Sequence, residues 1–68
     1  MAPHPKTLDE VDWEAATDAF IRSARNMTLA EIKERAEVGA ARLDAEGEGE
    51  TAEVYRRVAA IIQKRLTN

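Results

Sequence analysis

Hydrophobic and polar residues alternate along most of the chain with the three-to-four-residue period of an amphipathic α-helix. Three segments carry this pattern, at about residues 8–25, 28–45 and 51–66. In each segment the apolar side chains fall mainly on one side of the helix and the charged side chains on the other. The pattern predicts an all-α protein: a single three-helix bundle over residues 7–68, preceded by a disordered tail over residues 1–6.

The predicted helices have start and stop signals in the sequence. Segments 7–10 and 28–31 each place Thr and Glu at the spacing of a capping box, in which a hydroxyl and a carboxylate satisfy free backbone amides. An acidic loop, residues 44–50, precedes the third helix and contains Gly47. Glycine readily adopts the left-handed conformation that ends a helix.

The apolar faces indicate which residues form the core. The large side chains of the first and third helices assigned to it are Trp13, Phe20, Val54, Val58, Ile61 and Ile62. The second helix has a narrower stripe at heptad spacing, formed by Leu29, Ile32, Ala36, Gly39, Ala40 and Leu43. Glycine costs about 1 kcal/mol relative to alanine inside a helix. Gly39 is therefore either a packing notch for a neighbouring helix or a break.

Alanine supplies thirteen of the apolar residues, so the core is thin. A chain of this size gains stability from a partner or a second copy. We expect an up-down-up bundle with the second helix in the middle. A homodimer of helical hairpins, paired through the stripe on the second helix, is the alternative.

Charge is distributed unevenly around a net value of −3. Residues 1–50 contain twelve acidic and six basic residues, whereas residues 51–68 contain one acidic and four basic residues. A negative total disfavours nucleic acid as a partner, because nonspecific binding depends on neutralising phosphates. Ile21 and Val38 are apolar but fall on otherwise polar helix faces. An exposed apolar patch formed by the two would favour a protein partner. The candidate partner-binding residues are Ile21, Val38, Arg56, Arg57 and Lys64.

Carboxylates are abundant but fall on outward helix faces, and the other residue types that serve as nucleophiles, general bases or metal ligands are scarce. There is no cysteine, and His4 and Ser23 are the only residues of their kinds. The acidic loop resembles the first half of a calcium-binding EF-hand loop, but Tyr55 stands where such loops place a bidentate glutamate. We expect no enzyme activity, no cofactor and no metal site. No apolar run approaches the roughly 20 residues of a membrane span, and no signal peptide is evident, so we expect a cytoplasmic protein.

The run from residue 28 to residue 43 resembles the helix-turn-helix motif of bacterial repressors. Two positions depart from that motif, because Lys33 replaces its small residue and Glu37 its turn glycine. The resemblance implies a turn inside the run and DNA binding by the helix that follows. The matching apolar positions are Leu29, Ile32, Ala36, Val38 and Leu43.

These observations predict a small, non-enzymatic protein-protein interaction or regulatory accessory protein of the bacterial or bacteriophage type. Its partner is another protein or a second copy of the chain, and neither DNA nor a membrane is expected. One alternative is a helix-turn-helix-like DNA-binding regulator. The other is an acidic inhibitor or antitoxin-like protein that mimics nucleic acid with carboxylates of the first helix, namely Asp9, Glu10, Asp12, Glu14 and Asp18.

Overall fold

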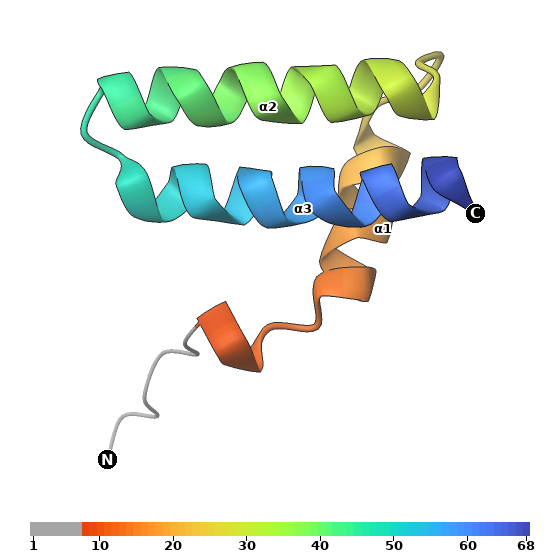
Figure 1. Cartoon of the computed structure of the whole chain (residues 1–68), viewed down its shortest axis with the longest axis horizontal. Coiled ribbons are helices and arrows are strands. Elements are labelled where there is room, and N and C mark those ends of the chain that lie inside the picture. The colour runs from red at the N-terminus through yellow and green to blue at the C-terminus, as the bar shows by residue number, and fades with distance from the viewer. Residues whose placement is uncertain (1–7) are drawn as a thin grey trace.

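The computed structural model describes residues 8–68, apart from the side chain of Asp9, and confirms the predicted three-helix architecture. A single 3₁₀ turn, η1 (Leu8–Glu10), precedes α1 (Trp13–Ser23), α2 (Leu29–Ala45) and α3 (Gly49–Thr67). The long helices α2 and α3 form an antiparallel hairpin, and α1 crosses it toward the C-terminal end of α3 (Figure 1). The predicted tail and the Thr7 capping box lie outside the described residues.

The first helix is shorter than the expected segment 8–25. Its N-cap is Asp12, whose carboxylate accepts a hydrogen bond from the Ala15 amide at 3.1 Å. Aspartate is among the strongest N-cap residues, so the helix starts at Trp13 rather than at the preceding segment. The Trp13 indole N–H donates to the Leu8 carbonyl at 2.8 Å and thereby ties η1 to α1.

The second helix is continuous through Gly39. Its predicted capping box is confirmed: the Glu31 amide donates to the Thr28 hydroxyl at 3.2 Å, and the Thr28 amide donates to the Glu31 carboxylate at 2.9 Å. A Cβ atom added at Gly39 would lie 2.8 Å from Cδ2 and 2.9 Å from Cε2 of Tyr55. Gly39 is therefore a packing notch for α3. The turn implied by the helix-turn-helix resemblance does not form.

The loop between α2 and α3 has a Schellman arrangement. Gly47 adopts a φ of 82°, as its sequence position predicted. Its amide donates to the Asp44 carbonyl at 3.1 Å, and the Glu48 amide donates to the Leu43 carbonyl at 2.7 Å. Because this turn closes so tightly, α3 begins at Gly49, two residues before the expected start.

The core lies between α2 and α3, with α1 packed on one side. Ile32, Val58 and Ile62 are its buried cluster, and buried alanines fill the rest of the interface. The helix in the middle is α3, not α2 as expected, because α3 packs extensively against both other helices. Of the residues assigned to the core, Val58 and Ile62 are buried. Half-buried are Trp13, Phe20, Val54 and Ile61.

The stripe on α2 packs within the chain. Ile32, Ala36 and Ala40 are buried, and the other three members, Leu29, Gly39 and Leu43, are half-buried. A hairpin dimer paired through this stripe would have to displace contacts that α2 already makes inside one chain.

A charged contact joins α1 to α3. The Arg65 guanidinium donates to Glu14 at 2.6 Å and to Asp18 at 2.8 Å. These two hydrogen bonds, the first one above all, raise the pKa of Arg65. On the same helix, α1, the hydroxyl of the fully buried Thr17 donates to the Trp13 carbonyl at 2.7 Å, so burial leaves no polar atom of this side chain unsatisfied.

Candidate partner-binding site

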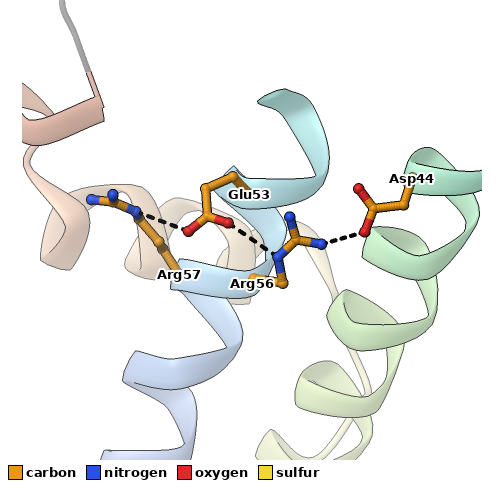
Figure 2. A network of polar contacts seen from close by, with 4 residues as sticks. All are labelled: Asp44, Glu53, Arg56 and Arg57. Carbon is orange, nitrogen blue, oxygen red and sulfur yellow. Dashed lines mark hydrogen bonds and ion pairs between the residues drawn. The ribbon is translucent and has the colours of Figure 1, made fainter. Parts of the chain in front are cut away.

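Two of the predicted partner-binding arginines form ion pairs within the chain (Figure 2). Arg56 bridges Asp44 at the end of α2 (2.5 Å) and Glu53 on its own helix (3.1 Å). Arg57 contacts the other oxygen of Glu53 at 3.4 Å. The hydrogen bond from Arg56 lowers the pKa of Glu53, and the hydrogen bond to Asp44 raises the pKa of Arg56.

Arg57 also lies over an aromatic ring. Its guanidinium carbon is 5.3 Å from the centroid of the Trp13 ring on α1, a distance that allows a cation–π interaction. Together with the Arg65 contact, these pairs connect α3 to both other helices. Of the three basic residues of α3 predicted to bind a partner, Arg56 and Arg57 therefore have structural partners. Lys64 stays exposed and forms no ion pair within residues 8–68.

A different pair of basic residues is available. Arg25 and Arg35 are exposed, and within residues 8–68 neither side chain forms a hydrogen bond or an ion pair. The sequence pattern does not single them out, because they lie ten residues apart in different segments and other charged residues surround each of them. Folding brings both to the wall of one cleft.

This cleft, of about 460 Å³, lies where the end of α1, the following turn, α2 and α3 meet. Phe20 and Tyr55 contribute an edge-to-face aromatic pair, with ring centroids 5.7 Å apart and planes at 68°. Asn26 adopts a left-handed φ of 67° in the turn, a conformation that asparagine tolerates better than most residues. The lining residues are Phe20, Ser23, Ala24, Arg25, Met27, Arg35 and Tyr55.

A shallower groove continues from the cleft onto the outer face of α2. Met27 and Arg35 line both hollows, so the two are adjacent. The groove also contains Val38, whose exposed fraction of 62% is high for a large apolar residue, along with Glu31 and Glu34. We call the cleft and this groove together the cleft surface.

Ile21 does not join Val38 in an outward patch. Its side chain is half-buried and packs against the core cluster of Ile32, Val58 and Ile62. The sequence pattern places Ile21 on a polar face of the first helix together with Thr17. That face packs inward in the fold, because Thr17 is fully buried and Ile21 contacts the core cluster.

The acidic residues of the first segment have several structural roles. Asp12 caps α1, and Glu14 and Asp18 bind Arg65. Glu10 is exposed, and the side chain of Asp9 lies outside the described part of the chain. Three of the five carboxylates considered as a nucleic-acid mimic are therefore used within the fold.

Within residues 8–68, no three His, Asp or Glu side chains gather in a way that could hold a metal ion. None of the helices described here has the length and apolar character needed to cross a bilayer. Comparison with protein-family models, curated proteins and solved structures found no match to the chain. The geometry of the cleft surface is therefore the basis for a functional proposal.

Proposed function

We propose that this protein is a small, non-enzymatic, cytoplasmic interaction module that acts by binding another protein through the cleft surface. One observation carries the proposal. Two arginines without partners in the described chain border an aromatic cleft, and the most exposed large apolar residue, Val38, stands in the groove beside it. Surfaces that combine apolar area, aromatic rings and arginine are typical of protein interfaces.

The use of the other charges supports this choice of surface. Arg56, Arg57 and Arg65 each contact a neighbouring helix, through Asp44, the Trp13 ring and the Glu14–Asp18 pair respectively. Arg25 and Arg35 have no such role among the described residues, so binding rather than stability is the better explanation for their position.

The test is affinity capture from a lysate of the source cells, followed by mass spectrometry, with matched variants of the full chain. Val38→Glu places a charge in the groove, and Ala19→Glu places the same charge on an exposed position of α1 that lines no part of the cleft surface. We expect a specific partner to be retained by the wild type and by Ala19→Glu, and lost by Val38→Glu. A set of captured proteins that Val38→Glu leaves unchanged would contradict the proposal.

A further inference from the structure

We infer that the cleft surface binds a short acidic segment of the partner protein, in which one or two carboxylates stand next to an apolar side chain. This inference rests on the proposed function and specifies the chemistry of what is bound.

The positive charges of the cleft indicate an anionic group. Arg25 lies in the turn after α1 and Arg35 lies on α2, and both line the cleft. No carboxylate of residues 8–68 pairs with either of them. Like charges around one cavity raise the local positive potential and attract an anion. Guanidinium groups match carboxylates well because they can donate two parallel hydrogen bonds.

The apolar residues of the cleft indicate a neighbouring hydrophobic side chain. Phe20, Met27 and Tyr55 are half-buried, so each keeps part of its apolar surface open to the cleft. Methionine adapts readily to the shape of a bound group. A volume of about 460 Å³ is within the range of sites that enclose a small ligand or a few side chains.

The acidic groups nearby favour a peptide over a nucleic acid. Glu31 and Glu34 line the groove beside the cleft, and the whole chain carries a net charge of −3. A phosphodiester backbone has a negative charge at every nucleotide and would meet these carboxylates. A peptide can place its carboxylates at Arg25 and Arg35 and apolar or basic residues along the groove.

The experiment is selection of short random peptides, displayed on phage, against the full-length protein. We expect the selected peptides to place Asp or Glu next to Leu, Ile, Met or Phe. A selected peptide, labelled with fluorescein, is then titrated with the wild type and with two double variants by fluorescence anisotropy. Arg25→Ala/Arg35→Ala should weaken binding by about tenfold, as expected for two exposed ion pairs.

The matched control is Arg22→Ala/Arg42→Ala, which removes the same charge from two exposed residues that do not line the cleft surface. We expect it to bind like the wild type. The wild-type affinity should also fall as salt concentration rises. Circular dichroism checks that both variants stay folded, as expected for exposed side chains whose ion pairs contribute little to stability.

Several results would overturn the inference. Selection of no peptide, selection without acidic residues, or equal weakening by both double variants would each do so. An oligothymidylate that binds more tightly than the peptides, through Arg25 and Arg35, would make nucleic acid the ligand instead. Self-association that the Arg25→Ala/Arg35→Ala variant abolishes would make a second copy the occupant.

These outcomes are separable from those of the lysate capture. A partner lost with Val38→Glu, together with peptides that lack acidic residues, would leave the proposed function standing and remove only this inference. If the capture also shows no dependence on Val38, both fall.

Discussion

Replacing Gly39 by alanine tests the close packing of α2 against α3. Two effects of opposite sign compete at this position. Alanine stabilises a helix interior by about 1 kcal/mol relative to glycine. The new Cβ would, however, lie 2.8 Å and 2.9 Å from two ring carbons of Tyr55, closer than carbon atoms can approach without movement.

A shift of the Tyr55 ring away from the new Cβ would disturb its edge-to-face contact with Phe20, whose ring centroid lies 5.7 Å away. Forcing an extra carbon into a packed interface typically costs about 1–3 kcal/mol. The steric cost therefore exceeds the helix-propensity gain. We expect Gly39→Ala to lower the free energy of unfolding by about 1 kcal/mol, which corresponds to a fall in Tm of about 4–8 °C for a domain of this size.

A double-mutant cycle isolates the contact. With the ring removed by Tyr55→Ala, the propensity term acts alone, and Gly39→Ala should raise stability by about 1 kcal/mol. The coupling between the two sites is then about 2 kcal/mol. Ala41→Gly, at an exposed position of the same helix, measures the local propensity term independently. Urea unfolding followed by circular dichroism gives all the values. Equal effects of Gly39→Ala with and without the Tyr55 ring would refute the reasoning.

Two further predictions concern charged groups. Hydrogen bonds from Thr28, chiefly from its backbone amide and then from its side chain, lower the pKa of Glu31. The ionised Glu31 carboxylate therefore stabilises the fold at neutral pH, and this stabilisation is lost as the pH falls below about 4.3. Glu31→Gln keeps an acceptor for the cap but does not titrate, so thermal melts across this range should show a shallower acid loss than the wild type; an unchanged slope would contradict this. Arg65→Ala removes both contacts to the α1 carboxylates and should lower Tm more than Lys64→Ala, with a difference that shrinks in high salt. Equal melting temperatures at low salt would show that the contact does not hold α1 in place.

Much of the fold was predictable because its signals are local. The Thr28 capping box, the left-handed Gly47 and the amphipathic pattern of each helix depend on neighbours within a few residues. The start of α1 was missed because two N-cap signals compete in the same segment, and the structure uses Asp12. The order of packing was missed as well, since no local signal indicates that α3 would be the helix in the middle.

The candidate site was predicted only in part. Val38 was selected correctly as an exposed apolar residue on α2. Arg56 and Arg57 were chosen because they lie on the outer face of a basic helix, but Asp44, Glu53 and the Trp13 ring engage them. These contacts depend on how the helices cross, which the sequence pattern of a single helix does not contain.

Helical periodicity and capping by themselves determined that this chain forms three amphipathic helices, and where the turn before α3 falls. They left open whether Gly39 breaks α2 or admits a neighbour, and only the ring of Tyr55 from α3 decided that it is a notch. Tertiary structure also decided that Arg56 and Arg65 form ion pairs between helices, whereas Arg25 and Arg35 line a cleft. The physical reason is that helix formation depends on contacts a few residues apart, whereas burial, ion pairing and cavities depend on residues that only packing brings together.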